Sequence, residues 1–295
     1  MASSPQVFDR LLLRARRQRA RALGAATFLI DRVSLDLADR LDAVLREFAV
    51  AVDLGTPTDA VRRALAAKKS VGTLIAADVL PADGLAVVID EEALPFRDGS
   101  LGLVVSALAL QFVNDLPGTL IQIRRALKPD GLFLAALLGG DTLIELRQAF
   151  AAAEAEVEGG ASPHVAPFAD VRELGVLLQR AGFALPVTDA DRLTVRYASP
   201  FALMADLRRM GGTNALAERR RMPLRRATLA RMVEIYAERF ADPDGRIRAT
   251  FEIVWLSGWA PHESQQKPLR PGSAQTRLAD ALGVREIGTG EKAGD

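Results

Sequence analysis

Apolar residues in the first half of the chain change from helical spacing to short continuous runs near residue 48. Residues 9–47 place apolar side chains three or four positions apart, which predicts two or three helices. Residues 48–55 are apolar up to a final Asp-x-Gly, as expected of a buried parallel strand. Later apolar runs predict four more strands, at 74–77, 85–89, 101–110 and 132–138. Helical patterns alternate with them at 59–69 and 115–127.

This alternation predicts an α/β fold of the Rossmann-like, doubly wound kind with a mostly parallel sheet. The second half is mainly helical, with helices expected over 142–157, 170–181, 200–210 and 226–240 and a strand over 193–197. Alternating apolar residues over 250–259 predict a last, antiparallel strand in a pair at the sheet edge. We therefore expect N-terminal helices over 1–47, an α/β domain over 48–261 with a helical cover inserted at about 142–240, and a largely disordered tail over 262–295.

The composition excludes several classes of protein and site. The chain of 295 residues has no cysteine, which rules out a disulfide scaffold and cysteine ligands for a metal. Its two histidines, His164 and His262, are too far apart in sequence to suggest a metal site, so none is expected. No apolar run is long enough for a transmembrane segment. The net charge of +1 makes the chain as a whole a poor match for nucleic acid.

Arginine is concentrated between residues 10 and 21, at positions 10, 14, 16, 17, 19 and 21. One interpretation is a solvated helix face whose arginines pair with nearby acids, such as Asp31, Asp36, Asp39 and Glu47. A second is a surface for an acidic partner, although no aromatic residues interleave with these arginines as in a nucleic-acid site. A mitochondrial transit peptide would also be rich in arginine and poor in acids, and that interpretation stays open.

Acidic residues and a glycine stand where the predicted parallel strands end. Asp53 and Gly55 close the first strand, Asp78 closes the second, and Asp90 and Glu91 follow the third. Ligands of doubly wound sheets bind at the carboxyl ends of the strands, where glycine lets the backbone approach and acids accept hydrogen bonds from ribose or amino groups. The same residues also fit an ordinary strand-to-helix turn and solvated loops, so the pattern alone leaves both interpretations open.

The fourth predicted strand ends in a polar stretch beside the same edge. Ser106 begins this stretch, and Gln111, Phe112 and Asn114 follow at the expected mouth of the pocket. A phenylalanine such as Phe112 belongs to the core more often than it stacks on a ligand, and both interpretations stay open. No Ser-His-Asp arrangement and no phosphate-binding loop of the Gly-Lys-Ser/Thr kind occurs. The polar stretch therefore indicates a binding surface without naming a reaction.

Four motifs in chain order resemble class I S-adenosylmethionine (SAM) methyltransferases: Asp53-x-Gly55, Asp90 to Leu94-Pro-Phe96, the stretch 106–115, and Leu127-Lys-Pro-Asp-Gly131. More narrowly, the chain is similar to the family of a mitochondrial respiratory complex I assembly factor with a methyltransferase fold, and to its alphaproteobacterial relatives. This narrower resemblance is carried by Phe8-Asp-Arg10, Val113-Asn-Asp-Leu-Pro117, Gly139-Gly-Asp-Thr-Leu143, Glu145-Leu-Arg147, Glu158-Gly-Gly160, Ser162-Pro-His164, Pro167-Phe168, Arg180-Ala-Gly-Phe183 and His262-Glu-Ser-Gln265.

The resemblance implies a SAM-binding fold and a protein client, for which the family suggests a subunit of respiratory complex I. It implies SAM contacts for Asp53, Gly55, Asp78, Asp90, Glu91 and Ser106, and client contacts for Gln111, Phe112, Asn114, Asp141 and His164. Three activities stay open: methyl transfer, assembly or binding without catalysis, and arginine hydroxylation as in the mitochondrial member. The protein would act in the bacterial cytoplasm, or in the mitochondrial matrix if its source is eukaryotic.

The chain departs from the family pattern in three places. The loop after Gly55 lacks the later glycines, the link from Asp78 to Leu85 is too short to hold a crossover helix, and Gln111-Phe112 stands where the family commonly has His-Trp. These departures predict that SAM binding is weak or lost. We expect the arginine-rich helix and residues 139–164 to face the client.

Overall fold

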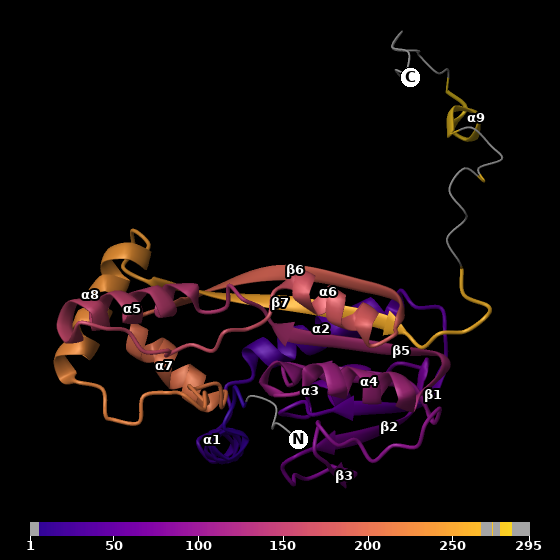
Figure 1. Cartoon of the computed structure of the whole chain (residues 1–295), viewed down its shortest axis with the longest axis horizontal. Coiled ribbons are helices and arrows are strands. Elements are labelled where there is room, and N and C mark those ends of the chain that lie inside the picture. The colour runs from indigo at the N-terminus through magenta and orange to yellow at the C-terminus, as the bar shows by residue number, and fades with distance from the viewer. Residues whose placement is uncertain (1–5, 267–272, 274–277, 285–295) are drawn as a thin grey trace. The chain divides into compact units, whose positions relative to one another are not determined.

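The computed structural model describes residues 6–266, 273 and 278–284, which separate into a compact unit up to Pro261 and a second unit from His262. The first unit is built on a seven-stranded sheet (Figure 1). Its strands are β1 (Phe48–Leu54), β2 (Val71–Asp78), β3 (Val87–Val88), β4 (Leu101–Ala107), β5 (Leu127–Leu138), β6 (Ala184–Tyr197) and β7 (Ile247–Trp259). The spatial order is β3-β2-β1-β4-β5-β7-β6, and β7 runs antiparallel to both of its neighbours. The α/β fold and the antiparallel last strand are therefore confirmed.

Helices cover both faces of the sheet. They are α1 (Arg10–Ala22), α2 (Phe28–Asp42), α3 (Ala60–Leu65), α4 (Leu116–Ala126), α5 (Ile144–Glu158), α6 (Val171–Arg180), α7 (Pro200–Arg209) and α8 (Arg226–Phe240), with a short 3-10 turn η1 (Leu110–Phe112). The central strands are apolar on both faces, so successive residues enter different cores. In β1, Phe48 and Ala51 pack with α2 and α3, whereas Val52 and Leu54 pack with α4 and α6.

Several elements differ in length from the sequence expectation. Helix α3 is shorter than 59–69, and β3 has only two residues. The greatest difference is β6, which runs over 14 residues where only 193–197 was expected. No helix lies between β2 and β3, so the expected short link is confirmed among the described residues.

The stretch expected to form a helical cover is divided between two places. Helices α5, α7 and α8 pack near one end of the β6–β7 pair (Figure 1), whereas α6 and β6 belong to the sheet and its covering layer. Leu174 and Leu178 of α6 are buried against the sheet, and Phe183 stacks on Phe133 with ring centroids 5.5 Å apart. Of the tail, the structure describes a short helix α9 (Leu278–Leu282), and the expected disorder concerns residues that lie mostly outside the described ones.

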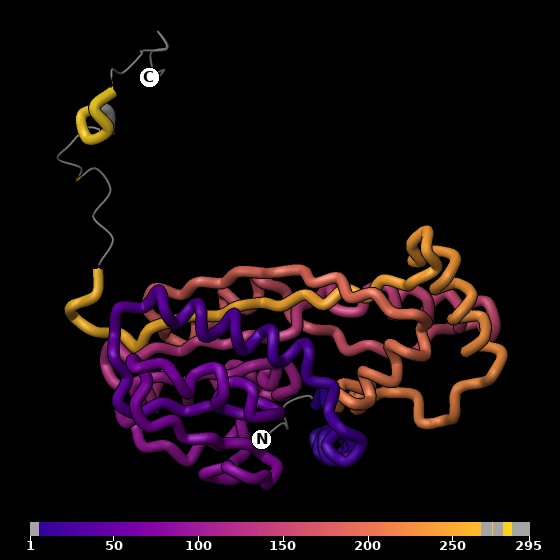
Figure 2. The backbone as a smooth tube through the Cα atoms, turned by 180° about the vertical axis from the view of Figure 1, so that it is seen from behind, coloured from indigo at the N-terminus to yellow at the C-terminus, as the bar shows by residue number. Residues whose placement is uncertain are grey.

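Helix α1 lies where the parallel strands end, beside α7 (Figure 2). Asp9 caps its N-terminus by accepting a hydrogen bond from Leu12 N at 3.0 Å, and Arg19 and Arg21 suit the negative end of its dipole. The segment before it is fixed to the core because Phe8 pairs with Asn114. None of the helices in the described ranges is long and apolar enough to cross a membrane.

Candidate functional site at the carboxyl ends of the strands

Asp53 is a buried carboxyl group at the end of β1, with 2% of its surface exposed. Its Oδ1 atom makes no hydrogen bond to any residue that the structure describes. Burial raises the pKa of Asp53 to about 7, against the opposing effects of a hydrogen bond with Thr56 and the charge of Arg62. An unpartnered polar atom in such a place is costly to the fold and suits a role in binding a ligand.

The turn after β1 is more closed than a glycine-rich loop. Gly55 has φ +73°, a conformation that glycine adopts without strain, and a Cβ there would lie 3.3 Å from Oε1 of Glu91. Thr56 is buried and its hydroxyl accepts a hydrogen bond from Ala107 N at 3.2 Å. Ser106 is fully buried and donates to Leu54 O at 2.7 Å. Thr56 and Ser106 thus join β1 to β4, and the Ser106 hydroxyl is engaged within the sheet.

Asp78 closes β2 and holds two arginines of α1. Its Oδ2 atom lies 2.8 Å from Nη2 of Arg17 and 3.1 Å from Nη2 of Arg21, while Oδ1 accepts a hydrogen bond from Val79 N. The Asp78 side chain is almost entirely buried. Both oxygens of the carboxylate that could receive ribose hydroxyls therefore have partners from this chain.

The acids that follow β3 are held by the same helix. Arg10 lies 2.6 Å from Asp90 and 2.6 Å from Glu91, and Arg14 lies 3.3 Å from Asp90. Burial raises the pKa of Glu91. Burial acts in the same direction on Asp90, but hydrogen bonds from the Glu92 backbone and Arg10 bring the pKa of Asp90 below its usual value.

The expected pairing of these arginines with the nearby acids is wrong. Asp31 binds Arg63 and Asp36 binds Arg32, whereas the inward arginines of α1 bind acids at the strand ends. The sequence did carry a signal for this arrangement. Positions 10, 14, 17 and 21 lie on one face of a helix, the face that also carries the buried Leu13 and Ala20.

The arginine side chains divide the space above the strand ends. The cavity that contacts Arg10, Arg17 and Glu91 measures about 50 Å³. A separate cleft of about 350 Å³ is lined by Asp53, Asp78 and Arg21 but not by Glu91. Small-molecule sites commonly measure roughly 300 to 1,000 Å³. The carboxylates suit the hydroxyl and amino groups of SAM, but neither of these two spaces contacts both Asp78 and Glu91.

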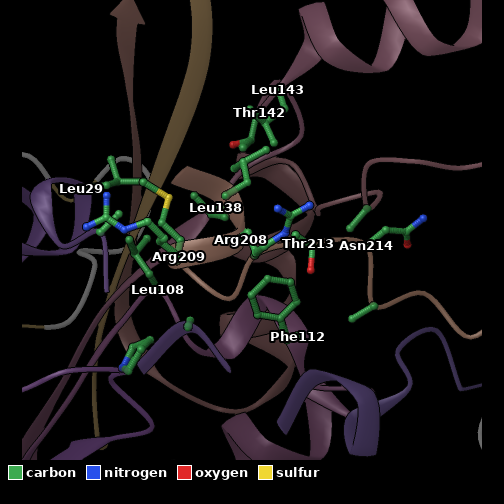
Figure 3. Close-up of a pocket in the computed structure, with 18 of the residues that line it drawn as sticks. Leu29, Leu108, Phe112, Leu138, Thr142, Leu143, Arg208, Arg209, Thr213 and Asn214 are labelled. Atoms are coloured by element: carbon green, nitrogen blue, oxygen red, sulfur yellow. The ribbon is translucent and has the colours of Figure 1, made fainter. Parts of the chain in front are cut away.

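A second cavity, of about 260 Å³ and thus larger than the one beside Glu91, lies between the strand ends and the cover and is lined mainly by apolar side chains. Phe112, Leu108 and Leu138 surround it together with Thr142 and Arg208 (Figure 3). Three predicted client residues line it, namely Gln111, Phe112 and His164. Oε1 of Gln111 is buried without a hydrogen bond to the described residues.

His164 is held firmly at the wall of this cavity. Its Nε2 lies 2.8 Å from Oε1 of the buried Glu154, and its ring stacks on Phe150 at 4.0 Å between centroids. Ser162 donates to the same carboxylate at 2.7 Å through its hydroxyl. These contacts fix the side chain of His164, so its orientation toward a bound molecule would be set before binding.

The structure does not bring the other two predicted client residues to the cavity. The Asn114 side chain accepts from Phe8 N at 2.8 Å and donates to Phe8 O at 3.1 Å, which anchors the segment before α1. Asp141 pairs with Arg192 at the edge formed by β6. Sequence reasoning also missed cavity residues that follow α7, such as Thr213 and Asn214, because no motif marks them.

Known proteins resemble this chain over most of its length. The methyltransferase domain family matches residues 36–135. The arginine hydroxylase NDUFAF5 of Danio rerio is 39% identical, over 95% of this chain and 91% of that protein. A malonyl-[acyl-carrier protein] O-methyltransferase of Gallionella capsiferriformans is 33% identical, over 86% and 92% respectively.

Solved structures support the same fold. A putative methyltransferase from Bacillus halodurans superposes with a TM-score of 0.51 at 16% identity, over 77% of this chain and 99% of that one. At such low identity the likeness concerns the fold alone. The fold class and the family resemblance expected from the sequence are confirmed. The chain is a SAM-dependent-methyltransferase-like protein and belongs to the methyltransferase-fold family that includes the arginine hydroxylase NDUFAF5.

Proposed function

We propose that this chain hydroxylates an arginine side chain of a protein client, a subunit of respiratory complex I, during assembly of that complex. The inserted oxygen atom would come from dioxygen, whose second oxygen atom leaves as water with two electrons from an external reductant and two protons. The observation that carries this proposal is the extent of the similarity to NDUFAF5. The methyltransferase domain family matches only residues 36–135, whereas the similarity to NDUFAF5 covers 95% of the chain at 39% identity. The O-methyltransferase of Gallionella capsiferriformans also matches most of the chain, but less of it and at lower identity, 86% at 33%. The similarity to NDUFAF5 is thus the greater in both extent and identity.

The cavity beside the strand ends suits an arginine substrate. The acids Asp78, Asp90 and Glu91 lie outside this cavity and hold the arginines of α1 at 2.6 to 3.3 Å. Arg17 lines both the small cavity and the larger one, so the two spaces adjoin. The larger cavity offers apolar walls for the aliphatic part of a side chain and Gln111 as a hydrogen-bond acceptor for its head.

The cofactor part of the proposal is that SAM binds at the strand ends with low affinity, through Asp53, Asp78, Asp90 and Glu91. The acids have the chemistry for ribose hydroxyls and amino groups, and the small cavity of about 50 Å³ accounts for the low affinity. Gly55 would let the backbone approach the ligand. The site of action is the bacterial cytoplasm, or the mitochondrial matrix for a eukaryotic source.

Methyl transfer is the second candidate, supported by the methyltransferase domain match and by the O-methyltransferase relative. Peptide mass mapping of complex I subunits, purified from the source organism with and without this gene, distinguishes the candidates. We expect an arginine peptide heavier by one oxygen atom that disappears in the deletion strain. A gain of one methylene group instead would establish methyl transfer. Failed assembly without either mass change would indicate a binding factor without catalysis.

Two variants, each expressed in the deletion strain in place of the wild-type protein, test whether the cavity is the client site. Gln111→Met removes the buried acceptor while keeping the side chain's length, and we expect it to leave most of the client unmodified. The matched control is Gln18→Met, because Gln18 lies on the exposed face of α1. Restoration of the modified peptide by both variants to the wild-type level would exclude this cavity as the client site.

A further inference from the structure

The charged face of α1 is turned toward the protein. Arg10, Arg14, Arg17 and Arg21 follow each other at helical spacing and are all partly buried. The exposed side of the helix carries Leu11, which is 76% exposed, together with Arg19. An ordinary surface helix places its charges in solvent, so the burial of four arginines indicates that they have partners within the fold.

Those partners are the acids that the strand ends would offer to a cofactor. The four arginines, which we call the arginine plug, make six ion pairs, with Asp78, Asp90, Glu91 and Glu92. Arg17 also donates to the Gly55 carbonyl oxygen at 3.4 Å, at the turn where the backbone would approach a ligand. The plug thus contacts the ends of β1 and β2 and the acids after β3 together.

The plug occupies the space as well as the carboxylates. Its side chains leave a cavity of only about 50 Å³ beside Glu91. Arg17 lines this cavity, Arg21 lines the neighbouring cleft, and both bind Oδ2 of Asp78. A nucleoside ligand that reached both Asp78 and Glu91 would have to pass through this position. Binding of such a ligand therefore requires the guanidinium groups to move away from the acids.

Both ends of the helix are anchored independently of the plug. At the start, Asp9 N donates to Ala215 O at 2.8 Å and the Asp9 carboxylate binds Arg219. At the end, Ala26 N donates to Arg209 O at 3.2 Å. The backbone of α1 is held at both ends, whereas its long arginine side chains can leave the acids by changing rotamer, at the cost of their ion pairs. Movement of the side chains is thus the easier way to free the acids.

We propose that the arginine plug is a built-in competitor of the cofactor: SAM and the guanidinium groups of α1 exchange for the same carboxylates while the helix stays anchored. This inference rests on SAM binding at the strand ends, as in the proposed function. The apparent association constant for SAM is then the intrinsic constant multiplied by the fraction of molecules in which the plug is open. A client that draws the arginines outward would raise SAM affinity through the same equilibrium.

Isothermal titration of the full chain with SAM tests the competition. The double variant Arg17→Gln/Arg21→Gln should bind SAM about tenfold more tightly than the wild type, if the plug closes about nine molecules in ten. Arg19→Gln is the matched control, since Arg19 is on the exposed face of the same helix, and it should leave the dissociation constant unchanged. An unchanged, weaker or undetectable affinity in the double variant overturns the proposal, whatever the mass mapping of the client shows.

A second measurement avoids any loss of stability in the variants. Wild-type protein is treated with phenylglyoxal, which reacts with accessible guanidinium groups, with and without saturating SAM, and the labelled arginines are identified by peptide mass spectrometry. SAM should increase the labelling of Arg17 and Arg21 severalfold and leave Arg19 unchanged. Equal or lower labelling of Arg17 and Arg21 in the presence of SAM would contradict displacement of the plug.

Discussion

The carboxyl group of Asp53 should make the protein less stable as the pH rises through neutrality, and Asp53→Asn should remove that dependence. The side chain is 2% exposed, and its Oδ1 atom is without a hydrogen bond to the described residues. Burial raises its pKa to about 7 from the ordinary value of 3.8. The folded protein therefore keeps a proton on Asp53 over a pH range in which the unfolded chain has lost it.

Proton linkage gives the direction and the size of the change in the free energy of unfolding with pH. Below pH 3.8 both states carry the proton, and above about pH 7 neither does, so the free energy of unfolding falls between these two values. A shift of about three units at roughly 1.4 kcal/mol each gives a loss on the order of 4 kcal/mol. Asparagine has a similar shape and does not ionise. The variant should thus match the wild type near pH 4 and exceed it by up to that amount near pH 8.

Urea unfolding followed by the fluorescence of Trp255 and Trp259 measures this difference at several pH values between 4.5 and 8.5. Differences between variant and wild type are compared at each pH, because other carboxylates titrate in both proteins alike. Asp83→Asn is the control, since Asp83 lies on the same cleft but is exposed. A stability difference between the Asp53 variant and the wild type that stays constant with pH would refute the reasoning.

Two further substitutions test the packing that positions the site. Gly258→Ala should destabilise the protein by about 1–3 kcal/mol in urea unfolding, because the new Cβ would lie 2.9 Å from Phe183 Cβ; Gly160→Ala, with nothing within 4 Å of its added Cβ, should be nearly neutral. Tyr236→Phe should lower thermal stability by about 1–2 kcal/mol, because it removes the donor to Arg248 O at 2.8 Å in the core; an unchanged melting temperature would mean that this hydrogen bond contributes nothing.

The sequence predicted the central sheet well because β1, β4 and β5 are buried on both faces. Continuous apolar runs with turn signals after them leave few alternatives to a parallel strand. The first part of β6 was missed for the opposite reason. It lies at the sheet edge, with Asp189 and Asp191 exposed and bound to Arg40, so no apolar alternation marks it. Its pairing with β7 fixes it as a strand, and that pairing is not local information.

The site was predictable in part. The acids at the strand ends stand where the parallel-strand pattern places them, and their spacing could be interpreted without a structure. The ion-pair partners of these acids could not be predicted, because Arg10 lies 80 residues and Arg17 lies 61 residues from its partner along the chain. Counting acids close in sequence led to Asp31 and Asp36, which bind other arginines. Ser106 and Asn114 were assigned to ligands by position, yet the structure uses both side chains within the fold.

The strand-end acids have opposite requirements with and without a ligand, and the two side-chain states of the arginine plug would reconcile them. A nucleoside binds to carboxylates that are buried, but a buried carboxylate with no partner destabilises the fold or takes up a proton. Asp53 has no arginine of α1 and its pKa rises to about 7. Asp90, bound to Arg10, has a lowered pKa, whereas burial raises the pKa of Glu91 even beside the same arginine. Arginines that pair with these acids in the empty site must also weaken the cofactor, because every guanidinium removed by SAM gives up an ion pair. Weak cofactor binding is then a consequence of how the empty site is stabilised, and does not require any of the strand-end acids to have been lost.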